Sequence, residues 1–278
     1  TCQEVLDSVL MSYRIAEDER VHLPALVNLD GFYLSFTREP VEVPEVGKVR
    51  EFLPTFEPKH PGFRASEPVS HVVSVLNGPM HSYFRYQLHR ALENAQTVHA
   101  AVSDEFAQLF GRDYATHEEY RLDDADIVLV MAGSFATKAK AAINRWRDAG
   151  KRVGLLRLRM TRPWPARALA AALSGRQAVG VIDQNISPGL GGIFFHELVG
   201  TLAGLGSAMP VCRSFVGGLG GKNISTGEFE HILATLERAE YSDSRIETEL
   251  LLTDRERKRI DQMLELAGKS HGEPAPCE

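Results

Sequence analysis

The spacing of apolar residues near the start of the chain predicts two elements. From Gln3 to Glu17 apolar positions recur close to helical spacing, which predicts an amphipathic helix. Val21 to Leu29 is a short apolar run of the length typical of a buried parallel strand, with Ala25–Leu29 as its centre. We expect the pair to be the last helix and strand of an α/β domain whose remainder precedes Thr1.

Proline dominates the next stretch, from Gly31 to Pro79. Its seven prolines forbid long regular elements, because each lacks a backbone N–H and restricts the residue before it. Six aromatic residues in the same stretch are too many for a disordered spacer. The sequence therefore predicts an irregular arm that packs against another part of the protein.

The longest periodic segment runs from Ser82 to Phe110 and predicts a helix. Its apolar positions step by four or three residues throughout, and Gly111 follows where a C-terminal cap glycine belongs. Beyond it, strand and helix patterns alternate, which predicts an α/β fold with a parallel sheet and right-handed crossovers. The expected strands are 127–132, 153–158, 178–182 and 210–216, and the expected helices are 137–149, 166–173, 193–205 and 225–239.

The last part of the chain, 241–278, is polar. It contains one predicted helix, 254–266, and we expect a disordered tail at 271–278.

Composition excludes several classes of protein. With 278 residues, 44% hydrophobic and 24% charged, the chain has the profile of a globular protein, and its net charge of −6 argues against nucleic-acid binding. We find no membrane span or signal peptide. Cys2, Cys212 and Cys277 are too few and too scattered for zinc, an iron–sulfur cluster or a disulfide framework. A reducing, cytoplasmic compartment is the expectation.

Three loops follow predicted strands, at the edge where open parallel sheets bind ligands. Gly133 and Ser134 follow the first of these strands, and backbone N–H groups there could hold an anion at a helix N-terminus. The simpler interpretation, which we favour, makes Ser134 or Thr137 the helix N-cap.

The other two loops are richer in polar groups and glycine. Asp183, Asn185 and Ser187 follow a strand, and we favour a turn at an interface over ligand binding. Gly220, Gly221 and Lys222 belong to a glycine-rich loop in which close backbone approach or positive φ is required. For this loop we favour structural packing over a ligand role.

No catalytic constellation emerges from the remaining polar residues. The spacing of His81, His89 and His99 along one helix does not suit a shared metal ion, and His196 within an apolar helix reads as a hydrogen-bonded core or interface histidine. Arg157, Arg159 and Arg162 form a basic cluster, for which solvated or intersubunit salt bridges are favoured over phosphate binding.

An ordered set of short motifs resembles the α subunit of pyruvate:ferredoxin oxidoreductase and related 2-oxoacid:ferredoxin oxidoreductases. Single motifs are weak, but their order over residues 3–240 is specific. Two departures, Phe36 where the family often has histidine and Ala132 within Met-Ala-Gly, leave the substrate open. The motifs are Gln3–Asp7, Asp30–Ser35, Glu39–Pro44, Phe84–Gln87, Met131–Ser134, Arg162–Pro165, Asp183–Ser187 and Gly218–Lys222.

The resemblance implies a domain organisation. Residues 1–35 would be the C-terminal remnant of a thiamine-diphosphate pyrimidine-type domain, 36–80 a linker arm, 81–240 a transketolase C-terminal-like domain and 241–278 an extension. The family's cofactor- and substrate-contacting residues are expected upstream of residue 1, so we assign no catalytic, cofactor-binding or metal-binding residue.

The implied reaction is oxidative decarboxylation of a 2-oxoacid, with thiamine diphosphate as electron sink, coenzyme A as acyl acceptor and ferredoxin as electron acceptor. Pyruvate is the first expectation, with branched-chain, aromatic and other 2-oxoacids as alternatives. The β, γ and δ subunits would hold the iron–sulfur clusters, the magnesium ion and most of the cofactor, and this chain alone would be inactive. A non-catalytic interaction or regulatory domain is the alternative function.

Overall fold

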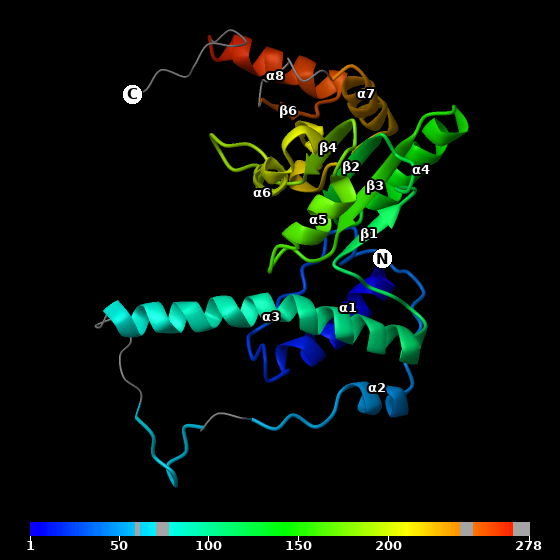
Figure 1. Ribbon diagram of the computed structural model, residues 1–278. Helices are drawn as coiled ribbons and strands as arrows, with labels where there is room; N and C mark the ends of the chain where they lie inside the picture. The colour runs from blue at the N-terminus through cyan, green and yellow to red at the C-terminus, as the bar shows by residue number, and fades with distance from the viewer. Residues whose placement is uncertain (59–61, 71–77, 240–246, 269–278) are drawn as a thin grey trace. The chain divides into compact units, whose positions relative to one another are not determined.

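The computed structural model describes residues 1–58, 62–70, 78–239 and 247–268. The chain divides into two compact units, each described here by itself. The first comprises residues 1–118 and 157–166, and the second comprises 119–156 and 167–278. Figure 1 traces the elements in chain order. The predicted tail at 271–278 lies outside the described residues.

The described residues of the first unit contain three helices. The side chain of Thr1 caps α1 by accepting a hydrogen bond from the backbone N–H of Glu4 at 3.2 Å. At the other end of the unit, Gly111 adopts φ +71° immediately after α3, as the predicted cap requires. The helices are α1 (Cys2–Ala16), α2 (Val46–Phe52) and α3 (Gly78–Phe110).

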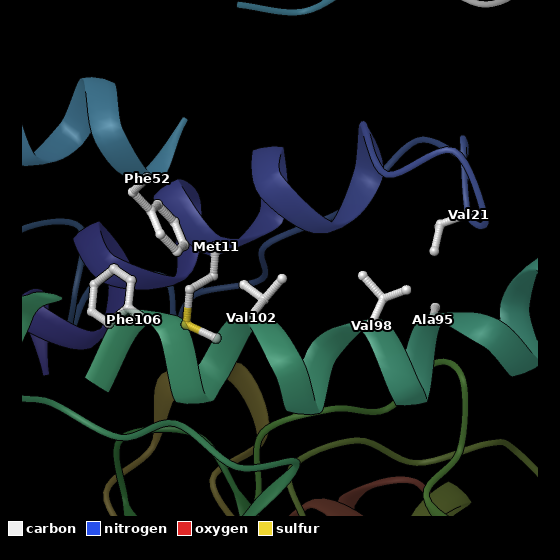
Figure 2. Close-up of a cluster of buried hydrophobic side chains, with 7 residues drawn as sticks. All are labelled: Met11, Val21, Phe52, Ala95, Val98, Val102 and Phe106. Carbon is white, nitrogen blue, oxygen red and sulfur yellow. The ribbon is translucent and has the colours of Figure 1, made fainter. Parts of the chain in front are cut away.

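The core of the first unit lies between these helices (Figure 2). Phe52 of α2 is fully buried and meets Phe106 of α3 edge to face, with ring centroids 5.2 Å apart. One stripe of α3 supplies most of the remaining apolar contacts. The buried cluster is Met11, Val21, Phe52, Ala95, Val98, Val102 and Phe106.

One prediction for the N-terminal third is wrong in this structure. Residues 22–30 form no strand, and the side chain of Leu26 is 92% exposed, because among the described residues no strand pairs with this segment to complete its hydrogen bonds. The arm contains α2, which was not predicted. Phe52 packs in the core as expected, but Phe36 and Phe63 are 78% and 79% exposed.

The described residues form a sheet of six strands in the order β1-β3-β2-β4-β5-β6. The sheet belongs to the second unit except for residues 117–118 of β1 and 157–158 of β3, which fall in the first. β2, β4, β5 and β6 run parallel to their neighbours in that sequence, with Val130 opposite Val181 and Val181 opposite Ser214. This confirms the predicted α/β fold class. The strands are β1 (His117–Tyr120), β2 (Ile127–Ala132), β3 (Val153–Leu158), β4 (Ala178–Asp183), β5 (Val211–Val216) and β6 (Thr248–Leu250).

Helices cover both faces of this sheet. α4 and α7 pack on one another and on β2, whereas α6 packs on β4 and β5 and lies on the opposite side of the strands in Figure 1. Close packing of α7 depends on Gly180, since a Cβ atom there would lie 2.7 Å from Leu236. The helices are α4 (Ala136–Asp148), α5 (Ala166–Leu173), α6 (Ile193–Leu202), α7 (Thr226–Glu237) and α8 (Asp254–Leu266).

Most predicted boundaries agree with these elements to within a few residues. α6 is shorter than predicted because the chain tightens into a 3₁₀ helix at Ala203–Ala208, and the short strands β1 and β6 were missed. Within the described part of the chain, no helix is both long and apolar enough to cross a bilayer.

Candidate functional site

The carboxyl ends of β2, β4 and β5 bring the three candidate loops to one edge of the sheet. Since these strands are neighbours and parallel, their C-terminal loops must lie side by side. A Cβ atom on Gly218 would lie 3.4 Å from the ring of Phe135 and 3.2 Å from Gln184. The structure thus places the Gly133, Asp183 and Gly220 loops together.

Asp183 is fully buried at the end of β4 and serves α6. Its carboxylate accepts hydrogen bonds from the backbone N–H groups of Phe194 at 2.9 Å and Phe195 at 3.2 Å. Burial raises the pKa of Asp183, while these two donors act in the opposite direction. The carboxylate is therefore occupied with the first turn of α6, whose amides it satisfies in place of a local cap.

Gly192 is required by the position of that carboxylate. A Cβ atom at this position would lie 2.2 Å from Asp183 Oδ2, so any larger residue would displace the aspartate.

Asn185 and Ser187 make the turn that leads to α6. The backbone of Ser187 exchanges hydrogen bonds with Gly191 at 2.8 and 2.9 Å, which closes the loop, and this agrees with the favoured interpretation of a turn. Asn185 Oδ1 is buried without a hydrogen-bond partner among the described residues. An interface role for this loop stays a prediction.

Lys222 is held by three oxygen atoms. Its Nζ donates to Glu228 at 2.8 Å, to Glu256 at 2.7 Å and to the carbonyl of Leu251 at 2.8 Å. Both carboxylates also belong to capping boxes, at the N-termini of α7 and α8. The ammonium is committed to packing, as the favoured interpretation of this loop proposed.

The glycines before Lys222 allow its approach. Gly220 and Gly221 adopt φ +65° and +79°, values at which an L side chain is strained. The run of glycines predicted either close backbone approach or positive φ, and the structure shows positive φ at these two positions.

The Gly133–Ser134 loop differs from its predicted capping role. α4 begins after Phe135, which occupies the N-cap position, and no side chain caps the helix there. Neither Ser134 nor Thr137 is the N-cap, because α4 starts at Ala136, one residue before the predicted start at 137. Gly133 turns the chain before this helix at φ +80°. Anion binding at this helix terminus, the alternative that was not favoured, stays untested.

In the first unit, the arginine cluster is tied to α1. Arg157 makes a bidentate pair with Glu4 at 2.8 and 2.9 Å and also binds Glu118 at 2.7 Å, and Arg159 reaches Glu4 at 2.8 Å. Burial raises the pKa of Glu4, but the two guanidinium groups outweigh burial and leave it below its usual value. The expected salt bridges exist, but they are partly buried and lie within one chain.

Sequence analysis missed a second polar cluster around Asp7. The carboxylate is fully buried and accepts hydrogen bonds from Arg112 Nε at 2.7 Å, from Tyr114 at 2.7 Å and from Gln3 at 3.0 Å. Burial and the bond to Asp7 raise the pKa of Tyr114. Only the spacing of Gln3 and Asp7, four residues apart on one helix face, could have indicated the cluster.

The described histidines can serve as hydrogen-bonding groups or as metal ligands. His196 is hydrogen-bonded as expected, since its Nε2 lies 2.8 Å from the carbonyl oxygen of Leu190. Among the residues that the structure describes, no three His, Cys, Asp or Glu side chains are grouped to hold a metal ion.

An open groove of about 570 Å³ lies beside α1 in the first unit. Its lining includes Val9 and Tyr13 of α1, residues 22–25 and Phe56. Its lining is mainly apolar, so it suits a polypeptide side chain better than a charged diphosphate.

Two protein-family models match the chain in order. Residues 1–104 match "Pyruvate flavodoxin/ferredoxin oxidoreductase, thiamine diphosphate-binding", and residues 125–229 match "Pyruvate:ferredoxin oxidoreductase core domain II". The fold and the two matches define a class, the subunits that carry thiamine-diphosphate-type domains of ferredoxin-linked oxidoreductases. The chain belongs to the pyruvate:ferredoxin oxidoreductase family.

Curated relatives agree with this assignment. Pyruvate synthase subunit PorA of Methanothermobacter thermautotrophicus is 38% identical over 86% of this chain and 61% of the relative. The corresponding subunit of Methanocaldococcus jannaschii is 40% identical over 86% of this chain and 60% of the relative.

A relative with a different substrate in its name is almost as similar. Ketoisovalerate oxidoreductase subunit VorA of Pyrococcus abyssi is 36% identical over 85% of this chain and 59% of the relative. The chain thus spans about 60% of the length of the curated relatives that it matches.

Proposed function

We propose that this chain acts as part of an α subunit in a 2-oxoacid:ferredoxin oxidoreductase, with pyruvate as the substrate. The observation that carries the proposal is the ordered match of both family models, together with identities of 38% and 40% to pyruvate synthase subunits over most of the chain. 2-Oxoisovalerate is a second candidate substrate, since a ketoisovalerate oxidoreductase subunit is 36% identical.

The described residues do not fit the charged part of thiamine diphosphate. Asp183 and Lys222, the charged groups of the candidate loops, are committed to α6, α7 and α8, and no group of metal ligands exists in the described parts of the chain. We therefore propose that partner subunits bind the diphosphate and its magnesium ion, and that they also carry the iron–sulfur clusters. Bound thiamine diphosphate would supply the electron sink for loss of CO₂.

The proposed role of this chain is to form one wall of the assembly. The groove beside α1 and the exposed apolar residues that follow it, Leu26 and Phe36, offer contact area to a neighbouring polypeptide. This arrangement supports the proposed assignment of residues 1–35 to the thiamine-diphosphate domain, whose remaining part would cover them.

Reconstitution tests the proposal. The chain is combined with candidate β, γ and δ subunits and with the preceding part of an α subunit, and reduction of ferredoxin or viologen is measured with coenzyme A and a panel of 2-oxoacids. We expect activity with pyruvate in the complete assembly and none with the chain alone. Failure of the chain to join any such assembly would contradict the proposed function.

A further inference from the structure

One apolar stripe runs along the whole of α3 but is covered over half of its length. The stripe steps by four or three residues from Met80 to Phe106, a single face of a helix. In the second half, Val98, Val102 and Phe106 are at most 3% exposed beneath α1 and α2. In the first half, Met80, Phe84 and Leu88 are 37%, 43% and 37% exposed.

The uncovered half continues an existing helix–helix contact. Figure 1 shows α1 crossing the C-terminal half of α3, while the other half extends beyond it. In Figure 2 the covered stripe ends at Ala95, beneath Val21. Because helices cover the rest of the stripe, the surface that remains has the ridges and grooves that another helix would fill.

Two arginines lie in the helix turns that carry the bare stripe, and Glu93 is the first acidic residue after them. Residues 78–92 contain Arg85 and Arg90 but no Asp or Glu, although the chain as a whole has a net charge of −6. Arg90 is paired with Glu93 at 2.8 Å, whereas Arg85 Nε donates to the ring of His81 at 3.4 Å. A partner with acidic side chains would complement this helix.

We propose that the N-terminal half of α3, the surface of Met80, Phe84 and Leu88 with Arg85 beside it, is the docking site for an amphipathic helix of a partner subunit. That helix presents aliphatic side chains flanked by Asp or Glu. The identity of the partner as a subunit of the same oxidoreductase rests on the proposed function.

Two other occupants fit less well. A second copy of α3 packed through the same face would place Arg85 and Arg90 near their own counterparts, which like-charge repulsion disfavours. A membrane surface attracts helices rich in lysine and arginine, but here two arginines stand on a chain with a net charge of −6.

Binding measurements with purified partner subunits test the inference. The dissociation constant is measured for the wild-type chain and for Phe84→Glu, Arg85→Glu and the matched controls Phe63→Glu and Arg255→Glu, at low and high salt. Phe63 is 79% exposed and lies outside α3, and Arg255 is exposed on α8. We expect Phe84→Glu to weaken binding by at least about tenfold, as loss of an interface anchor does.

The charge variant gives a second readout. Arg85→Glu should weaken binding at low salt and reduce its salt dependence, whereas both controls should bind like wild type. Hydrogen exchange on the wild-type complex provides a measurement that needs no variant, and the amides of residues 80–92 should exchange more slowly in the complex. Circular dichroism of each variant checks that the fold is intact.

The possible failures are distinguishable. If partner subunits bind the wild type and Phe84→Glu equally well, and residues 80–92 gain no protection, the docking site is refuted while the proposed function stands. If no partner subunit binds the wild type, both are refuted. Self-association, or binding to anionic phosphatidylserine vesicles, that Phe84→Glu abolishes would also overturn the proposed occupant.

Discussion

Lys222 shows how one side chain can connect several elements. Its ammonium group bridges the first turns of α7 and α8 and the carbonyl of Leu251. Burial lowers the pKa of Lys222, but the bonds to Glu228 and Glu256 outweigh it and raise the value overall. The hydrogen bond from Lys222 in turn lowers the pKa of Glu256 to about 2. The loop that carries Lys222 is thereby fixed to both helices.

Replacing Lys222 should destabilise the protein. We expect Lys222→Met to lower the free energy of unfolding by about 1–3 kcal/mol, because the Glu228 side chain, 9% exposed, loses its charged partner. Urea denaturation measures the change. Lys258→Met, at an exposed position of α8, is the control and should stay within about 0.5 kcal/mol of wild type. Equal effects of the two variants would contradict the structural role of Lys222.

His99 carries a buried ring nitrogen without a hydrogen-bond partner in the described part of the chain, Nδ1. Burial lowers the pKa of His99 below its ordinary value of 6.5, the charge of Arg159 acts in the same direction, and Asp113 opposes both. The folded protein therefore disfavours the protonated ring, whereas the unfolded chain accepts the proton near pH 6.5. Stability contributed by neutral His99 is complete above that pH and is lost as the pH falls.

This difference predicts how stability depends on pH. Between about pH 7.5 and pH 5.5, His99→Gln should lose less unfolding free energy than wild type, because it cannot take up a proton on unfolding. Denaturant titrations at both pH values measure the loss. His89→Gln, whose parent side chain is 70% exposed, is the control and should follow wild type. A wild-type slope in His99→Gln would disprove the assignment.

At the scale of elements, α1 is held by polar contacts as well as by its apolar face. Asp7 binds Arg112 and Tyr114 on one side of the helix, and Glu4 binds Arg157 and Arg159. Because these partners are more than a hundred positions away along the chain, they fix α1 against the rest of the first unit.

Removal of the Asp7 carboxylate should be costly. Asp7→Ala leaves Arg112 and Tyr114 without their acceptor, and we expect a loss of about 3–5 kcal/mol in unfolding free energy. Urea denaturation of Asp7→Ala and of wild type measures this difference in unfolding free energy. Glu93→Gln, in an exposed ion pair of α3, should change stability by less than about 1 kcal/mol. If Asp7→Ala were as mild as Glu93→Gln, the Asp7 cluster would not anchor α1.

Elements that a continuous pattern of neighbouring residues defines agreed best between sequence and structure. Strands β2 and β4 are continuous apolar runs and helix α5 follows a helical pattern, so all three could be predicted closely. Gly133 directly follows β2, and Pro165 directly precedes α5. α2, β1 and β6 are short, and packing rather than pattern determines them.

The same limit applies to the candidate site. Strand order could place the loops of Gly133, Asp183 and Gly220 at one edge. It could not reveal that Asp183 serves α6 or that Lys222 binds Glu256, since those partners lie far along the chain. The strand predicted at Val21–Leu29 is wrong because an apolar run forms a buried strand only where a neighbouring strand is present.

For the molecule as a whole, the described residues predict that cofactor binding requires the assembly. Addition of thiamine diphosphate and Mg²⁺ should leave the melting temperature of the isolated chain unchanged, because a ligand stabilises a protein only by binding its folded state. The reconstituted complex should melt at a higher temperature with the cofactor than without it. Thermal scans of both samples measure this, and stabilisation of the chain alone would show a binding site that we have not recognised.

The length of α3 has a mechanical consequence. Its 33 residues make a rod about 50 Å long, of which one half is clamped in the core. A helix bends little unless a kink-forming feature interrupts it. A partner that displaces the exposed end near Met80 would therefore tilt the packed end around Phe106. A displacement of the free end would therefore change the packing around Phe52 and Met11, where α2 and α1 contact the buried half of α3.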